Sequence, residues 1–286
     1  MQAPEEITIK LPHIELAALA YGPVDGPPVL ALHGWLDNAA TFTKLAPRMP
    51  GLRIIALDLA GHGLSGHRPL GCEYHLSDYV IDTLRVADAL GWERFSLLGH
   101  SLGAIVSTLL ASACPERVER LALIDGMLPL FDSPDSAPER LGLALRRRLA
   151  PGRGKSIYAH ADEAIEARMA GHRTVSREAA TVLVKRALMD AEGGGFVWRS
   201  DSALTLPTPI RTTLEQGIAF AKGIQCPAVF VAADDGIRQD FPGLDALCRQ
   251  LPITVERIPG GHHVHLDDDM GAQAVADCFK GLFAIP

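Results

Sequence analysis

The sequence predicts an α/β protein in which a mostly parallel, twisted sheet is flanked by helices and interrupted by one helical insertion. Three observations support this prediction. Short apolar runs recur along the chain, segments with helical periodicity lie between them, and one long central stretch shows helical patterns alone. Strands buried on both faces of a parallel sheet are continuously apolar, so the runs indicate such strands. Their alternation with helices defines the class.

The strands are expected in the following order. Residues 7–11 and 14–20 form an antiparallel pair ahead of the parallel strands. The later strands are 29–32, 53–57, 95–98, 121–124, 228–231 and, last in the chain, 253–258. The runs from 29–32 to 228–231 are short and mostly apolar, as is typical of strands with no solvent-exposed face.

Three helices are expected outside the insertion, one of them over residues 102–113. Apolar residues between Tyr79 and Leu90 recur at helical spacing, with Ser77 as a plausible N-cap. Gly91 follows them and is a favoured residue just past the end of a helix. After the last strand, residues 270–283 are expected to form the final helix.

The stretch from about 126 to 212 interrupts the alternation of strands and helices. It is rich in alanine, arginine and leucine, and no convincing buried strand lies inside it. Its helical patterns lie at 139–149, 162–170 and 177–189. We therefore expect residues 1–125 and 213–286 to form the core and residues 126–212 to form an all-helical cap.

The composition is that of a globular protein. Hydrophobic residues make up 48% and charged residues 21% of the 286 positions, which allows a sizeable core. The net charge of −7 would repel a phosphate backbone, so nucleic acid is not expected as a partner. The longest nearly apolar run, 105–114, is well short of the ~18 to 20 residues that span a membrane. No membrane span is expected.

The cellular compartment is predicted from the amino terminus and the cysteines. The first ten residues carry two glutamates and lack the layout of a secretory signal. The five cysteines are odd in number, widely spaced and without a Cys-x-x-Cys pair, which argues against a disulfide framework and a structural zinc site. We therefore expect a cytoplasmic protein.

One motif predicts nucleophilic chemistry. Gly99-His100-Ser101-Leu102-Gly103 follows an expected strand and begins an apolar helical segment. This is the context of the Gly-x-Ser-x-Gly nucleophile elbow, a strained turn that exposes the serine hydroxyl and needs glycine where a Cβ would clash. The alternative is a tight turn with an incidental serine.

A serine nucleophile needs a base and an acid elsewhere in the chain. Such residues are expected at later strand ends, in the order serine, aspartate or glutamate, histidine. Asp235 follows one expected strand and His262 follows the last one. The carboxyl ends of parallel strands are where such sheets place their catalytic groups.

Further motifs accompany these residues in chain order. They are His33-Gly34-Trp35 with Asp37-Asn38, Asp58-Leu59-Ala60-Gly61-His62-Gly63-Leu64-Ser65, the Ser101 motif, Asp125-Gly126, Asp234-Asp235 and Gly261-His262-His263-Val264-His265. Together they resemble the α/β-hydrolase superfamily, and most closely its capped, serine hydrolase-like esterases. The resemblance covers nearly the whole chain except the insertion. Trp35 stands where His-Gly-Gly-Gly lipases have further glycines, so that branch is not supported.

The resemblance implies a role for each matching residue. Ser101 is the expected nucleophile, His262 the general base, and Asp235 the acid that orients His262. Asp125 is the less favoured alternative for the acid. The backbone N–H groups of Trp35 and Leu102 would form the oxyanion hole. Candidates for the substrate pocket are His33, Gly34, His100 and His263.

The run of histidines raises the question of a metal. His262, His263 and His265 lie close together, but no further ligands with metal-like spacing accompany them. The family that the chain resembles uses no metal. We therefore expect neither a metal nor another cofactor.

The expected function is hydrolysis of a small or medium carboxylic ester through an acyl-enzyme on Ser101, with a small molecule as the partner. A serine-based C–C bond hydrolase or another acyl hydrolase would use the same residues. A ligand-binding receptor with slow or no turnover is the alternative from another class. The insertion also carries a basic run, residues 140–155, which would favour anionic substrates or a lipid surface, or form a solvated face. The sequence does not predict an oligomeric state.

Overall fold

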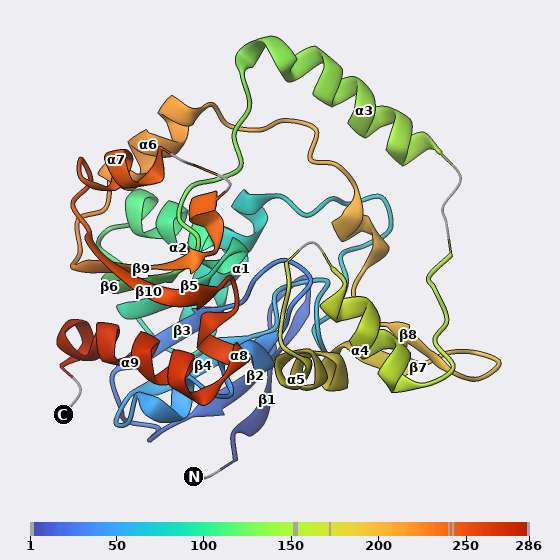
Figure 1. Ribbon diagram of the computed structural model, residues 1–286, viewed down its shortest axis with the longest axis horizontal. Helices are drawn as coiled ribbons and strands as arrows, with labels where there is room; N and C mark the ends of the chain where they lie inside the picture. The colour runs from blue at the N-terminus through green and yellow to red at the C-terminus, as the bar shows by residue number, and fades with distance from the viewer. Residues whose placement is uncertain (1–2, 151–153, 172, 240, 242, 285–286) are drawn as a thin grey trace.

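The computed structural model describes residues 3–150, 154–171, 173–239, 241 and 243–284. Its main sheet has eight strands in the order β1-β2-β4-β3-β5-β6-β9-β10 (Figure 1). The strands are β1 (Glu5–Lys10), β2 (Glu15–Tyr21), β3 (Pro28–Leu32), β4 (Arg53–Leu57), β5 (Phe95–His100), β6 (Val118–Ile124), β9 (Ala228–Asp235) and β10 (Thr254–Gly261). The predicted fold class is therefore confirmed.

The strand directions also agree with the sequence. β2 pairs antiparallel with β1 and with β4, whereas all pairs from β4 to β10 are parallel. In register, Leu32 lies opposite Gly99, which in turn lies opposite Leu123. The carboxyl ends of β3, β5 and β6 therefore meet at one edge of the sheet, and the loops that follow them are neighbours.

Helices cover both faces of the sheet. α1 (Leu76–Ala89), α2 (Leu102–Ala113) and α6 (Leu214–Lys222) pack against one another on one face, whereas α8 (Val264–Asp267) and α9 (Asp269–Phe283) lie on the other (Figure 1). A short helix, α7 (Leu244–Cys248), precedes β10. Among the described residues, no helix is both long and apolar enough to cross a bilayer.

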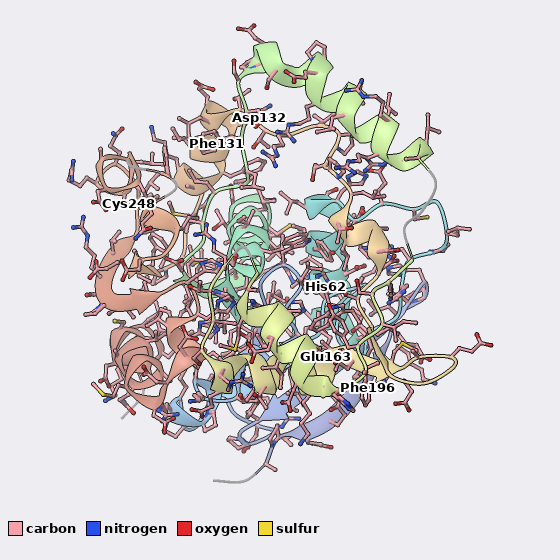
Figure 2. All side chains as sticks on the ribbon, turned by 45° about the vertical axis from the view of Figure 1, so that its right-hand side comes forward. His62, Phe131, Asp132, Glu163, Phe196 and Cys248 are labelled. Atoms are coloured by element: carbon pink, nitrogen blue, oxygen red, sulfur yellow. The ribbon has the colours of Figure 1, made fainter. Side chains whose placement is uncertain are left out.

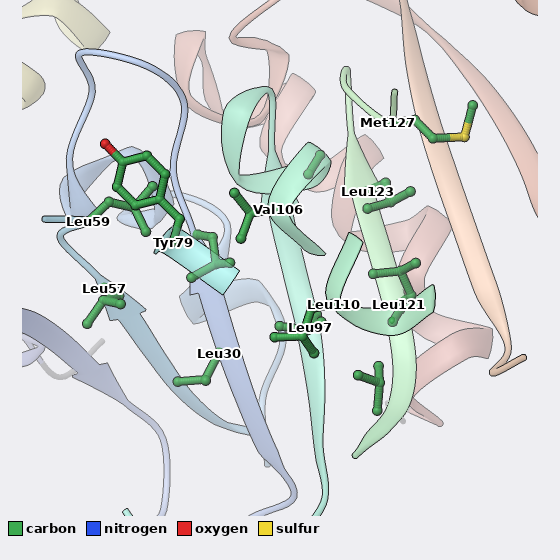
Figure 3. Packing of buried hydrophobic residues seen from close by; sticks show 14 of the residues in the cluster. Leu30, Leu57, Leu59, Tyr79, Leu97, Val106, Leu110, Leu121, Leu123 and Met127 are labelled. Carbon is green, nitrogen blue, oxygen red and sulfur yellow. The ribbon is translucent and has the colours of Figure 1, made fainter. Parts of the chain in front are cut away.

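The two-sided cover explains why the strands are continuously apolar. In β3, Leu30 and Leu32 belong to the core under α1 and α2, whereas Val29 and Ala31 belong to the core under α9. Because side chains alternate between the faces of a strand, every residue of β3 must be apolar to fill both cores. Figure 3 shows the first core, with residues such as Leu97 on β5 and Leu121 on β6.

The helix expected around residues 79–90 begins earlier than predicted. α1 starts at Leu76 with His75 as its N-cap, so the assignment of Ser77 as N-cap is wrong. The carboxylate of Asp78 accepts a hydrogen bond from the His75 backbone N–H at 3.1 Å. The backbone N–H of the N-cap residue thus has an acceptor three residues further along the chain, and this contact fixes the start of the helix.

The insertion, residues 126–212, contains three helices: α3 (Ala137–Leu149), α4 (Ala161–Met169) and α5 (Arg177–Ala187). It also contains a two-stranded ribbon, β7 (Leu188–Asp190) and β8 (Phe196–Trp198), so the expectation of an all-helical segment is wrong. Phe196 on this ribbon lies beside Glu163 of α4 in Figure 2. The ribbon is short and lies outside the main sheet, so it lacks the long apolar run that predicts a buried strand.

Candidate active site

Ser101 lies in a strained turn between β5 and α2. Its backbone has φ 51° and ψ −114°, a conformation that costs free energy for any residue except glycine. The flanking glycines are required by close packing. A Cβ on Gly103 would lie 1.9 Å from the carbonyl oxygen of Leu32, and one on Gly99 would lie 2.5 Å from the Cα of Ala104. The turn therefore has the geometry expected of a nucleophile elbow.

His262 follows β10 and pairs with a carboxylate. Its Nδ1 lies 2.5 Å from Oδ2 of Asp125, and Asp125 is completely buried. The same carboxylate accepts backbone N–H groups of Ala233 at 3.2 Å and Ile237 at 2.9 Å. Gly236 lies between these two donors, and a Cβ there would lie 2.2 Å from Asp125 Oδ2. The chain thus folds closely around Asp125.

The structure contradicts the expected pairing of His262 with Asp235. Asp235 is exposed, and its carboxylate accepts a hydrogen bond from Nε2 of Gln239 at 3.1 Å. The physical reason is that β9 continues as far as Asp235, which lies opposite Gly261 in the sheet. Asp125, at the end of β6, instead accepts one amide from within β9, that of Ala233, and one from the turn after Asp235, that of Ile237. Asp125, the less favoured sequence candidate, therefore orients His262.

The electrostatics leave His262 neutral. Burial lowers the pKa of His262, and the hydrogen bond to Asp125 opposes this effect without cancelling it. Because Nδ1 faces a carboxylate, the neutral imidazole carries its proton on Nδ1 and has a lone pair on Nε2. A lone pair on this nitrogen is what a general base requires.

The loop after β3, which contains Trp35, is fixed by hydrogen bonds of its neighbouring residues. His33 donates through Nδ1 to the carbonyl of Gly34 at 2.7 Å and accepts the Leu59 N–H on Nε2 at 2.9 Å. The next residues form a tight turn, with Leu36 at φ 60°. The Trp35 side chain is half exposed and donates to the carbonyl of Leu204, in the insertion. These contacts fix the loop without using the Trp35 N–H.

The second predicted oxyanion amide belongs to Leu102. Leu102 is the first residue of α2, and the first N–H groups of a helix have no intrahelical acceptor. They also carry the partial positive charge of the helix amino terminus. The Leu102 N–H is therefore not used by the helix itself, and the oxyanion role of the Trp35 and Leu102 amides stays a prediction.

The four predicted pocket residues are buried. His33, Gly34, His100 and His263 all lie in the interior, where they brace the loops instead of lining an open surface. A cavity of about 440 Å³ lies elsewhere, between α4, α5 and the ribbon of the insertion. It includes neither Ser101 nor His262, so we do not assign it to the candidate site.

Directly behind these loops lies a polar cluster whose residues stand in the sequence motifs but whose association no motif predicts. Asp37 accepts hydrogen bonds from Arg168 Nη2 at 2.7 Å and from His263 Nε2 at 3.0 Å. Burial alone would raise the pKa of Asp37, but the neighbouring His263, Arg168 and His100 hold it well below its ordinary value. Asp37, His100 and His263 each offer one atom able to bind a metal, and these atoms lie within 4.8 Å of one another. Arg168 comes from the insertion, and no motif predicts its contact with the core.

A second arginine joins the insertion to the core. Nε of Arg186, on α5, lies 3.1 and 2.9 Å from the two carboxylate oxygens of Asp58. Its terminal nitrogens donate to both oxygens of Glu6 at 2.7 and 2.6 Å. Asp58 is completely buried at the end of β4, in the motif that follows that strand. Burial raises the pKa of Asp58, and the Arg186 charge opposes this effect.

The fold and this arrangement of residues define an α/β-hydrolase. A family model for the alpha/beta hydrolase fold matches residues 27–150. The chain is 33% identical to a serine hydrolase-like protein of Danio rerio, covering 97% of this chain and 89% of the relative. It is 30% identical to one of Dictyostelium discoideum, covering 92% and 78% respectively. The chain therefore belongs to the serine hydrolase-like proteins of the α/β-hydrolase superfamily.

A solved structure extends this similarity to the whole chain. The crystal structure of a hypothetical protein from Pseudomonas aeruginosa PAO1 is 54% identical, covers 98% of this chain and 99% of that chain, and superposes with a TM-score of 0.95. That similarity includes the insertion.

Proposed function

We propose that the protein is a carboxylic ester hydrolase that works through an acyl-enzyme on Ser101. The observation that carries the proposal is the buried His262–Asp125 pair at the same sheet edge as the strained Ser101 turn. Serine is a poor nucleophile unless a positioned base removes its proton. A neutral imidazole whose Nδ1–H is held by a carboxylate is suited to that step.

The proposed reaction has two halves. His262 accepts the Ser101 proton while the serine oxygen bonds to the ester carbonyl carbon, and the carbonyl oxygen becomes an oxyanion beside the N–H groups of Trp35 and Leu102. His262 then returns the proton to the departing alcohol, which leaves an acyl-enzyme. In the second half, His262 activates water, which releases the acid and restores Ser101. Asp125 stabilises the imidazolium in both halves.

The insertion is proposed to act as a cap over this site and to select the substrate. The Trp35 side chain bonds to Leu204 of the insertion, so the loop with the proposed oxyanion amide touches the cap directly. We propose small or medium acyl esters as substrates. C–C bond hydrolases and other acyl hydrolases use the same residues, and a receptor with slow turnover is the alternative from another class.

A fluorophosphonate probe tests the proposal directly. Only a serine activated by a base attacks such an electrophile readily, so we expect one covalent adduct on the wild-type chain and none on Ser101→Ala. Intact-mass analysis reads the adduct, and p-nitrophenyl esters of graded chain length then report the acyl preference. An unlabelled wild-type chain, under conditions that label a known serine esterase, would contradict the proposal. Labelling without ester turnover would favour the receptor.

A further inference from the structure

Behind the proposed site lies a buried cluster of three Lewis bases. Asp37 follows β3, His100 ends β5 and His263 follows β10, with exposed fractions of 3%, 0% and 2%. Their oxygen and nitrogen donors converge within 4.8 Å. Asp37 and His263 face each other at 3.0 Å, and His100 Nδ1 lies 3.8 Å from the same Asp37 oxygen.

The protonation state of His100 follows from its hydrogen bonds. Its Nε2 lies 2.9 Å from the backbone carbonyl oxygen of His262, which can only accept a hydrogen bond. His100 must therefore carry its proton on Nε2 and a lone pair on Nδ1.

As a result, a polar atom in the interior has no partner. Nδ1 of His100 has no hydrogen-bond partner among the described residues, although its lone pair lies near the Asp37 carboxylate. An unpaired buried polar atom costs free energy, and two Lewis bases facing each other repel. A cation between them would remove both penalties.

The backbone leaves space for a small ion at this point. A Cβ on Gly34 would lie 3.0 Å from His100 Nδ1 and 3.1 Å from Asp37 Oδ2. Because residue 34 is glycine, that volume beside both donors is not filled by a side chain. In a tetrahedral site with metal–ligand bonds of about 2.0 to 2.1 Å, two ligand atoms lie about 3.3 Å apart. The distances from Asp37 Oδ2 to His263 Nε2, 3.0 Å, and to His100 Nδ1, 3.8 Å, lie on either side of this value.

A cation from the insertion already reaches the edge of the cluster. Arg168 Nη2 lies 2.7 Å from Asp37 Oδ1 and 3.1 Å from His263 Nε2. However, His263 Nε2 cannot both donate to Asp37 and accept from Arg168, so one of these contacts is not satisfied. Arg168 thus neutralises Asp37 without meeting the needs of both histidines.

We propose that Asp37, His100 and His263 form a binding site for a divalent transition-metal ion, and that Arg168 competes with this ion for Asp37. Two imidazole nitrogens and one carboxylate oxygen are a donor set that suits Zn²⁺, with a fourth position left for water. The ion is not a cofactor of the proposed reaction. It is a ligand that enters when Arg168, and with it the α4 part of the insertion, withdraws.

Metal binding at this place is expected to inhibit. Asp37 lies two residues from Trp35, His100 precedes Ser101, and His263 follows His262. Coordination would pull on three of the loops that carry the proposed catalytic groups, and small displacements there cost large factors in rate. This consequence depends on the proposed function, whereas the binding site itself does not.

Calorimetric titration of Zn²⁺ into the metal-free full-length chain tests the site. We expect one ion per wild-type chain and a loss of affinity in Asp37→Asn that exceeds the roughly 10- to 100-fold cost of removing a residue that only supports a ligand. Affinity should increase in Arg168→Met, because the competing cation is gone. His67→Gln is the matched control, since His67 lies 3.8 Å from the carboxylate of Asp201 in a more exposed pair. This control is expected to bind like the wild type.

Two further readouts keep the test decisive. Tetrahedral coordination should give bound Co²⁺ an intense visible spectrum, which Zn²⁺ displaces. Zn²⁺ should also slow ester hydrolysis reversibly, with EDTA restoring it. Unchanged or weaker binding in Arg168→Met would overturn the proposal even if Asp37→Asn failed to fold. Loss of binding in His262→Ala, with Asp37→Asn unaffected, would assign the ion to His262 instead.

Discussion

The sheet edge and the insertion hold their functional groups in different ways. At the edge, Ser101 and Asp125 both have positive φ values, 51° and 43°, and neighbouring backbone groups surround them. In the insertion, α3 forms ion pairs through Arg148 with Glu73 of the core and through Arg140 with Asp132 of the insertion itself. Asp132, labelled in Figure 2, lies between α3 and the core. Only Ala144 of α3 is buried.

This difference indicates which groups are held in fixed positions and which can move. Positions fixed by backbone turns and burial cannot move without disturbing the packing around them. Contacts made by long charged side chains can break and reform while both partners stay folded. We therefore expect the chemistry to depend on the sheet edge, and the access of ligands to depend on the insertion.

The largest expected effect is on the acid. Asp125→Asn presents an amide to His262 Nδ1, which disfavours the tautomer with the lone pair on Nε2, a change that costs about 10⁴-fold in turnover in serine proteases. Asp235→Asn is the matched control, because Asp235 is exposed and bonds to Gln239. Ester hydrolysis by the two folded variants is the measurement. A larger loss in Asp235→Asn would return the acid to the position that the sequence favoured.

The choice between these two aspartates shows how far the sequence could predict the site. The elbow, the order of strands and the position of His262 follow from local patterns, because glycines and apolar runs report on the adjacent backbone. The choice of acid depends on where β9 ends, and the ends of strands and helices are the features that a sequence predicts least well. Asp125 and Asp235 both follow buried strands, so pattern alone could not separate them.

The charged contacts between the insertion and the core also could not be predicted from the sequence. Asp58 stands in a recognisable motif, but its partner Arg186 lies 128 residues further along the chain. The spacing of arginines in α5 does not say which of them is buried. Similarly, the donors of the proposed metal site come from three loops that only the sheet register brings together.

Breaking the buried ion pair should have the second largest effect. Arg186→Met leaves the Asp58 carboxylate buried without its charge partner, which costs about 3 to 5 kcal/mol of folding free energy. Because burial already raises the pKa of Asp58, the loss should be smaller at low pH, where the carboxyl is protonated. Urea unfolding at pH 8 and pH 5 measures both values. Equal losses at the two pH values would show that Asp58 does not titrate between them.

Acid should destabilise the sheet edge through its buried histidines. Burial lowers the pKa of His62 and of His265 to about 3, against an ordinary value of 6.5. Between these values the unfolded chain binds the protons and the native chain does not, so stability falls as pH decreases below 6.5. Between pH 7.5 and pH 5.5 each histidine should contribute about 1.4 kcal/mol, or about 3 kcal/mol for the two together.

Urea unfolding between pH 7.5 and pH 5.5 checks this slope. His265→Gln should reduce it by about the share of one histidine, provided that the glutamine can still reach Thr41, whose hydroxyl lies 2.8 Å from His265 Nε2. A slope that His265→Gln leaves unchanged would mean that this imidazole titrates normally in the folded chain.

The smallest effect is expected from breaking an exposed ion pair on the helix that also carries Arg186. Arg177 lies on the same helix as Arg186, pairs with Glu166, and has a side chain that is 55% exposed. Exposed ion pairs contribute about 0 to 1 kcal/mol, because water solvates both charges and salt screens them. Arg177→Met should therefore change the unfolding free energy several-fold less than Arg186→Met, although the substitution is the same. Because the substitution is the same, a difference in unfolding free energy between the two variants is caused by the burial of the carboxylate partner. Equal losses in the two variants would show that burial of the partner is not the cause, and the contrast between the sheet edge and the insertion would fail.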